Sequence, residues 1–290
     1  MYTLGSPSSG NEGFNIPGSG TLNASGCGIV DNGDYNAEED STISADTFGV
    51  SGNLSGEVGS VTCATPGPCP RYRIPAAADP LSQLTAPCPS CSGGNIINVP
   101  GGGKPCSGTG CSYSGGTYTI SPGTYCSVTI NGGASDQVVF SPGVYIIDGI
   151  GPMSAGCPSA SLNITGNDTI GGTGVTFYFT NSSTINMNMT GTPTLSLTAP
   201  NSGPYAGILM YQDSKDTTGP SLGGNNGSNY GGALYFPEAQ LTFVGSGTSI
   251  NVGVVVSDSI NISGNHTVNL LGSAGLPPGV NPIKNPTLVE

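Results

Sequence analysis

The stretch that decides the fold runs from Ser121 to Gly149 and reads SPGTYCSVTINGGASDQVVFSPGVYIIDG. It contains one phrase twice, first as SPGTY from Ser121 to Tyr125 and again, twenty residues later, as SPGVY from Ser141 to Tyr145. Proline presets the first angle of a turn, and glycine allows the positive φ of a tight corner. The β-branched and aromatic runs that follow should alternate between a packed interior and water. A short repeat with one turn and short strands predicts one rung of a solenoid, which needs neighbouring rungs to bury its apolar side.

Similar runs recur toward the C-terminus at steps of about twenty to thirty residues, as expected of solenoid rungs with corners of variable length. These runs are 174–179, 206–211, 233–236 and 252–256. Between them lie segments in which Leu, Ile or Met alternates with Asn, Ser or Thr, namely 161–165, 184–190, 194–198 and 259–263. The pattern predicts an all-β chain folded as a right-handed parallel β-helix.

The spacing of the runs and the distribution of proline divide the chain into four parts. Residues 1–63 form early rungs, 64–116 a Pro- and Cys-rich excursion, 117–271 the main β-helix, and 272–290 a tail or end cap. Because proline cannot donate to a strand ladder, we expect no regular strands in the excursion. The segment from Asp79 to Leu84 can form one helical turn. We expect disulfides to hold the excursion against the solenoid.

The composition excludes several classes of function. The chain has 49 Gly, 24 Pro, no Trp, 8% charged residues and a net charge of −12. With five Lys and Arg residues it cannot line a groove that follows phosphates, so we expect no nucleic-acid binding and no direct membrane contact. The N-terminus is polar and shows no signal peptide or membrane span, so a targeting segment or anchor is expected to be absent from this sequence.

Cysteines are concentrated before residue 158. In a polar, Ser/Thr-rich chain, nine cysteines favour an extracytoplasmic, disulfide-bonded protein. Zinc ligation and redox chemistry at the Cys88–Cys91 pair are the alternatives. The odd count leaves one thiol free or joined to another chain. The disulfide candidates are Cys27, Cys63, Cys69, Cys88, Cys91, Cys106, Cys111, Cys126 and Cys157.

Acidic residues crowd into the segment from Asp31 to Asp46. A solvated surface loop is one interpretation and a calcium site the other, since Ca²⁺ takes several carboxylate and carbonyl oxygens. No other metal or cofactor is expected. The calcium candidates are Asp31, Asp34, Glu38, Glu39 and Asp40.

Ordered phrases begin at Ser121, Ser141, Gly172, Leu197, Gly232 and Ile260. Together they resemble the secreted β-rich region of TadG-like proteins of the bacterial tight-adherence (Tad/Flp) pilus system. The resemblance implies a cell-surface or pilus-associated protein without a catalytic motif. Its expected partners are other copies of itself, pilus or cell-envelope proteins, or surface glycans.

Two other functions stay open beside a non-enzymatic surface, adhesion or filament protein. A polysaccharide lyase or hydrolase needs paired carboxylates, for which Asp213, Asp216 and Glu238 are candidates with Lys215 beside them. The single histidine, His266, is expected at the surface. An ice- or crystal-binding solenoid would use outward rows of Thr, as 184–190 and 194–198 suggest, but the uneven rung lengths argue against a regular lattice. Open solenoid ends could also join subunits by strand addition.

Overall fold

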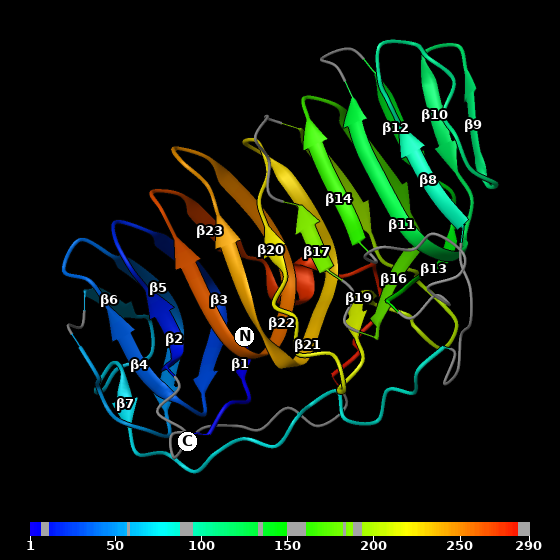
Figure 1. Ribbon diagram of the computed structural model, residues 1–290. Coiled ribbons are helices and arrows are strands. Elements are labelled where there is room, and N and C mark those ends of the chain that lie inside the picture. Colours follow the sequence, from blue (N-terminus) through cyan, green and yellow to red (C-terminus); the bar gives the residue numbers. More distant parts are fainter. Residues whose placement is uncertain are drawn as a thin grey trace.

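The computed structural model describes residues 1–6, 12–56, 59–87, 95–132, 136–149, 161–181, 184–187 and 193–283. These residues form 23 strands of a single hydrogen-bonded sheet, in which parallel pairs predominate (Figure 1). The all-β prediction is therefore confirmed. The first seven strands are β1 (Tyr2–Thr3), β2 (Glu12–Ile16), β3 (Thr21–Asp31), β4 (Asp34–Ala37), β5 (Thr42–Val50), β6 (Ser60–Cys63) and β7 (Arg71–Tyr72).

The middle of the chain forms further strands of the same sheet. These are β8 (Asn95–Val99), β9 (Cys111–Ser114), β10 (Thr117–Ile120), β11 (Gly123–Gly132), β12 (Gln137–Phe140), β13 (Gly143–Asp148), β14 (Ser161–Gly166), β15 (Thr169–Thr173), β16 (Val175–Thr180), β17 (Thr184–Met187) and β18 (Thr194–Thr198).

The C-terminal part contains the two longest strands and a short 3₁₀ helix. The elements are β19 (Ile208–Gln212), β20 (Ser221–Leu222), β21 (Ser228–Val244), β22 (Ser249–Ser263), β23 (Thr267–Leu270) and η3 (Gly272–Gly275).

The parallel pairings arrange the strands in three columns, which the chain visits repeatedly in the same order. The first column contains β10, β12, β15, β18, β23, β6 and the first parts of β21, β22, β3 and β5. The second contains β13, β16, β19, β1, β7 and the adjoining parts of the long strands. The third contains β8, β14, β17, β20, β2, β4 and the ends of β11, β21 and β22.

The repeated SPGxY phrase forms the corner between the first and second columns. The Tyr125 hydroxyl donates to the Ser121 carbonyl at 2.5 Å, and the Tyr145 hydroxyl donates to the equivalent Ser141 carbonyl at 2.7 Å. Gly143 has a φ of 142°, a conformation that favours glycine, and a side chain there would meet Pro122 at 2.7 Å. The two copies therefore make the same tyrosine-to-carbonyl contact on adjacent rungs.

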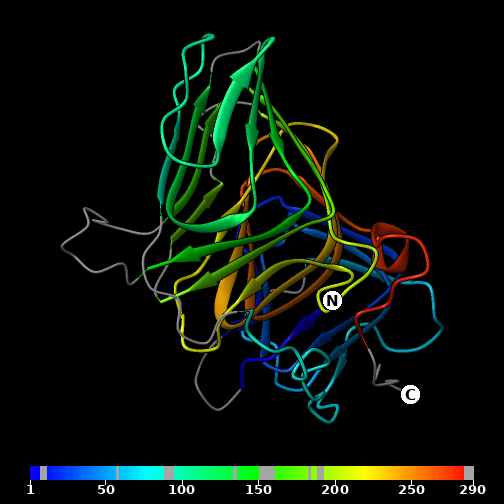
Figure 2. The ribbon, with the colours of Figure 1, turned by 90° about the vertical axis from the view of Figure 1, so that its right-hand side faces the viewer.

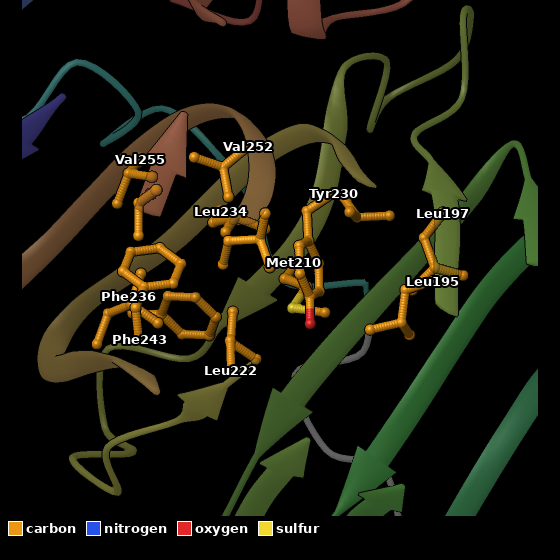
Figure 3. Close-up of a cluster of buried hydrophobic side chains, with 14 of the residues drawn as sticks. Leu195, Leu197, Met210, Leu222, Tyr230, Leu234, Phe236, Phe243, Val252 and Val255 are labelled. Carbon is orange, nitrogen blue, oxygen red and sulfur yellow. The ribbon is translucent and has the colours of Figure 1, made fainter. Parts of the chain in front are cut away.

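The interior is a continuous apolar core that runs through the stack. It contains inward residues from all three columns, and Figure 3 shows part of it, with Met210 and Tyr230 between Phe236 on one side and Leu195 and Leu197 on the other. When the molecule is turned by 90°, the green strands face the viewer and enclose this interior (Figure 2). Alternation holds in β14 and β18, where inward Leu and Ile are buried and outward Asn, Ser and Thr are more exposed. Side chains at 184–190 lie outside the described residues.

The middle of the second column is buried on both sides. Every residue of β16 and β19 is buried, which explains why these strands read as continuous apolar runs in the sequence. The outward rings of Tyr178, Tyr211 and Tyr235 lie next to each other, with centroids 5.1 and 5.4 Å apart. They belong to a second apolar cluster that includes Leu81 from the predicted excursion.

The strap, defined as residues 74–87, is the part of the excursion that covers this tyrosine row. Its Leu81 is fully buried, and Asp79 accepts a hydrogen bond from the Tyr235 hydroxyl at 2.6 Å. Ala77 exchanges two hydrogen bonds of 2.8 Å with the Asn32 side chain. Figure 1 shows this cyan segment running along the edge of the molecule away from β7. The described contacts of the strap are hydrogen bonds and apolar packing, and the predicted disulfide candidates that follow it, Cys88 and Cys91, lie outside the described residues.

The excursion also contains regular strands, contrary to the expectation from its prolines. β7, β8 and β9 all fall within 64–116, and β8 pairs with β11 in the third column. These strands fit because each lies between prolines: β8, for example, ends immediately before Pro100. The Asp79–Leu84 segment makes the expected turn, in which the Leu84 amide donates to the Leu81 carbonyl at 3.0 Å.

The order of the strands in the stack differs from their order in the chain. β23 pairs with β3 through Thr267–Thr21 and Asn269–Asn23, and β2 pairs with β22. The N-terminal strands thus continue the stack beyond the C-terminal ones, as the blue and orange strands of Figure 1 show. β6 and β7 form one end of the stack and β8, β9 and β10 the other.

Candidate functional surface

The outward side of the first column carries two files of side chains in register. The first, the hydroxyl file, is interrupted where β21 begins. It consists of Thr117, Gln137, Thr169, Thr194, Ser249, Thr267, Thr21, Thr42 and Ser60. None of its members is buried.

The second, the amide file, lies two residues further along each strand and is continuous across ten strands. It consists of Thr119, Val139, Gly171, Ser196, Asn229, Asn251, Asn269, Asn23, Ser44 and Thr62. The Asn269 side-chain amide donates to Asn251 at 3.1 Å, and the Asn23 amide donates to Asn269 at 3.3 Å. These bonds hold the asparagine side chains in a ladder along the stack.

Neither file contains a charged residue, although the chain carries 17 acids. The files also contain no aromatic side chain. Except at Val139 and Gly171, the residues of both files carry hydroxyl or amide groups, which can donate and accept hydrogen bonds, so this face offers many weak polar contacts.

The carboxylates considered for an enzyme serve mainly in turns. Asp213 accepts hydrogen bonds from the Lys215 amide at 2.9 Å and from the Tyr178 hydroxyl at 2.7 Å. Burial opposes its ionisation, but these hydrogen bonds outweigh burial and lower its pKa. Asp216 is fully buried and accepts from the Thr218 amide at 3.1 Å. Glu238 is exposed and lines a separate pocket of about 290 Å³ with Asp79 and Asp258.

The calcium candidates are divided between the interior and the surface. Asp31 is fully buried and accepts hydrogen bonds from Thr3 and from the Gly33 amide; burial raises its pKa to about 6. Asp34 accepts from the Asn53 amide at 2.8 Å. The remaining candidates, Glu38, Glu39 and Asp40, are exposed. In the part of the chain that the structure describes, no three His, Cys, Asp or Glu side chains are grouped to hold a metal ion.

Disulfides close two short loops. Cys63 is bonded to Cys69 and Cys106 to Cys111; Cys126 is also disulfide-bonded. Cys27 is a free, half-buried thiol. The other predicted cysteines, Cys88, Cys91 and Cys157, lie outside the described residues.

Buried polar groups gather at the corner between the third and first columns. His266 is only 3% exposed, and burial lowers its pKa, so the expected surface position was wrong. The corner turns this side chain toward Gly245, where an added Cβ would meet it at 3.0 Å. Asp168 is buried as well, with its carboxylate against Gly132. Burial and the nearby Asp136 raise its pKa to about 6, although a hydrogen bond from the Gly132 backbone lowers it.

The two files were not recognised as one surface from the sequence. The signal was present, because Thr267-Val-Asn269, Thr21-Leu-Asn23 and Thr42-Ile-Ser44 share one pattern. Only the pairing of β23 with β3 brings these segments together.

No protein-family model matches the chain, and no curated protein or solved structure matches it. Among the described residues, no helix is both long and apolar enough to cross a membrane.

Proposed function

We propose that this chain is a non-enzymatic bacterial surface protein, associated with a pilus or the cell envelope, that acts by displaying the outward face of its first column. The observation that carries the proposal is the amide file, which is uncharged and in register over ten strands. Pilus or envelope proteins and surface glycans are the proposed partners. The resemblance to TadG-like proteins supports the pilus association.

A right-handed parallel β-helix is the proposed architecture. The repeated visit to three columns in a fixed order supports it, as does the core shared by all three columns. Parallel strands need crossover connections, which in this chain are the other two columns of each rung.

An extracytoplasmic location is part of the proposal. Two disulfides between cysteines five and six residues apart support it, because such bonds persist in oxidising compartments.

Display is favoured over head-to-tail stacking because both ends of the stack are modified. At one end β9 pairs antiparallel with β10, and the Cys106–Cys111 disulfide closes the segment before it. At the other, the Cys63–Cys69 loop follows β6 directly. Short, covered edges of this kind oppose the addition of further strands.

The turn contacts of Asp213 and Asp216 support the non-enzymatic assignment. They fix these carboxylates in local hydrogen bonds instead of leaving them directed at a substrate.

The test compares two exposed positions that each gain one positive charge. Thr42→Lys places the charge in the hydroxyl file, and Gln240→Lys places it at the end of β21 in the third column. Binding of the labelled wild-type chain to intact envelope fragments, including pili, should fall at least tenfold in Thr42→Lys and change less than twofold in Gln240→Lys. Equal loss in both variants, or no binding by the wild type, would contradict the proposed function.

A further inference from the structure

The most regular part of the display face lies where the two ends of the chain meet. Five successive strands, β22, β23, β3, β5 and β6, each present one residue of the hydroxyl file and one of the amide file. We name this set the junction array: Ser249, Asn251, Thr267, Asn269, Thr21, Asn23, Thr42, Ser44, Ser60 and Thr62.

The array forms a two-dimensional lattice. Neighbouring strands lie about 4.8 Å apart and alternate residues of one strand about 6.6 Å apart, so the five strands span about 19 Å along the stack. These repeats are on the scale of the oxygen lattice at the surface of hexagonal ice. Each of the ten lattice points carries a hydroxyl or amide group that can hydrogen-bond to water.

Uneven rung lengths do not disturb this lattice. Eighteen residues separate Ser249 from Thr267, and twenty-one separate Thr21 from Thr42, yet each pair is directly opposed. The corners and the other two columns absorb the difference. The uneven spacing of the strands in the sequence is therefore no argument against a regular array.

The threonine and asparagine side chains of the array are held before any ligand binds. Threonine is stiff at χ1 because it is branched at Cβ. Asn251, Asn269 and Asn23 are fixed by the amide ladder. Binding to such a surface sacrifices little side-chain entropy, which favours contact with a rigid, periodic partner.

The chemistry of the array suits ordered water. It has no aromatic or large apolar side chain, so its contacts with a ligand are hydrogen bonds. It also has no charge, so no tightly held ionic hydration shell must be removed from it. Fixed polar groups such as those of the array can hold bridging water molecules at a small cost in entropy.

We propose that the junction array binds the surface of ice, holding a layer of water in register with the crystal. This inference rests on the proposed display of the first column and adds the ligand. It requires only the folded chain, without a metal or cofactor.

The experiment measures the fraction of protein incorporated into a slowly growing ice hemisphere, together with inhibition of ice recrystallisation. Wild type and Gln240→Lys should be enriched in ice, and Thr42→Lys should be at least tenfold less enriched. Thermal unfolding of all three confirms that the array variant folds. A second array variant, Thr21→Lys, should lose enrichment in the same way.

Exclusion of the wild type from ice, or equal incorporation of the array and control variants, would overturn the inference. The envelope-binding assay separates the two proposals. If wild type binds the envelope but not ice, the ligand is wrong and surface display stands; if it binds neither, both proposals fail.

Discussion

Replacement of Leu81 by alanine tests the role of the strap as a covering element. Leu81 is fully buried in the cluster with Tyr178, Tyr211 and Tyr235. Removal of a buried leucine side chain costs 2–5 kcal/mol, depending on how far the site collapses. Because the strap lies at the surface and can settle onto the tyrosines, we expect about 2–3 kcal/mol.

This loss should appear mainly as easier local opening of the strap. A change of about 2–3 kcal/mol raises the population of the open state about 30- to 150-fold. Two backbone amides of the strap report on its closed state. The amide of Ala77 donates a hydrogen bond to Asn32, and the amide of residue 81 donates one to Asp79. Hydrogen exchange at these amides should accelerate by that factor, whereas exchange in β14 and β16 should change little.

The control is Leu54→Ala, because Leu54 is 40% exposed and its truncation should change stability by less than about 0.5 kcal/mol. Unchanged exchange in the strap of Leu81→Ala would refute the reasoning. Equal acceleration throughout the chain would also refute it, since the strap would then be part of the global folding unit.

Three further substitutions test the corners. Asp168→Asn should raise the free energy of unfolding at pH 7.5, because the wild-type pKa of about 6 means that the folded state binds the proton more tightly than the unfolded state. The free energy of unfolding of the wild type should accordingly fall as the pH rises from about 4 to 6. Urea titrations should show a smaller fall in the variant, and the same pH dependence in variant and wild type would contradict this. Gly143→Ala should destabilise by more than about 1 kcal/mol in the same titration, since its φ is 142° and Pro122 occupies the space, and a neutral result would contradict the corner geometry. Tyr145→Phe removes the donor to two carbonyls and should lower the free energy of unfolding by about 1–3 kcal/mol; a stability within 0.3 kcal/mol of wild type would show these bonds to be dispensable.

Local pattern was enough to predict the strand content and much of the core. Alternation in 161–165 identified inward Leu162 and Ile164, whereas the burial of β16 on both sides was not predicted. The SPGxY corners were predicted as turns, although only Gly143, and not Gly123, has a positive φ.

Long-range arrangement could not be predicted from local pattern. Nothing in the periodicity of 1–63 shows that β3 pairs with β23 across 246 residues, because every rung offers a similar edge. The burial of His266 was missed for a related reason, since a corner side chain can face either way. The strap was identified as an excursion, but its attachment through Asp79, Leu81 and the tyrosine hydroxyls depends on which column it crosses.

The candidate surface was predictable only in part. Outward Thr and Ser were evident on single strands such as 194–198, but the junction array combines residues 21–62 with residues 249–269. Its regularity is a property of the stack, and corner lengths hide it in the sequence.

Cross-linking between the two ends of the chain tests the central claim most directly. Asn23 and Asn269 are replaced by cysteine in a Cys27→Ser background and joined with a short bis-thiol reagent, because the stack places their side chains 3.3 Å apart. We predict efficient cross-linking within one molecule, identified by mass spectrometry, while cysteines at Asn23 and Ser196, four strands apart and separated by about 19 Å, should remain unlinked. Absence of the 23–269 link, or a link formed only between separate molecules, would contradict the stack and the display face that depends on it.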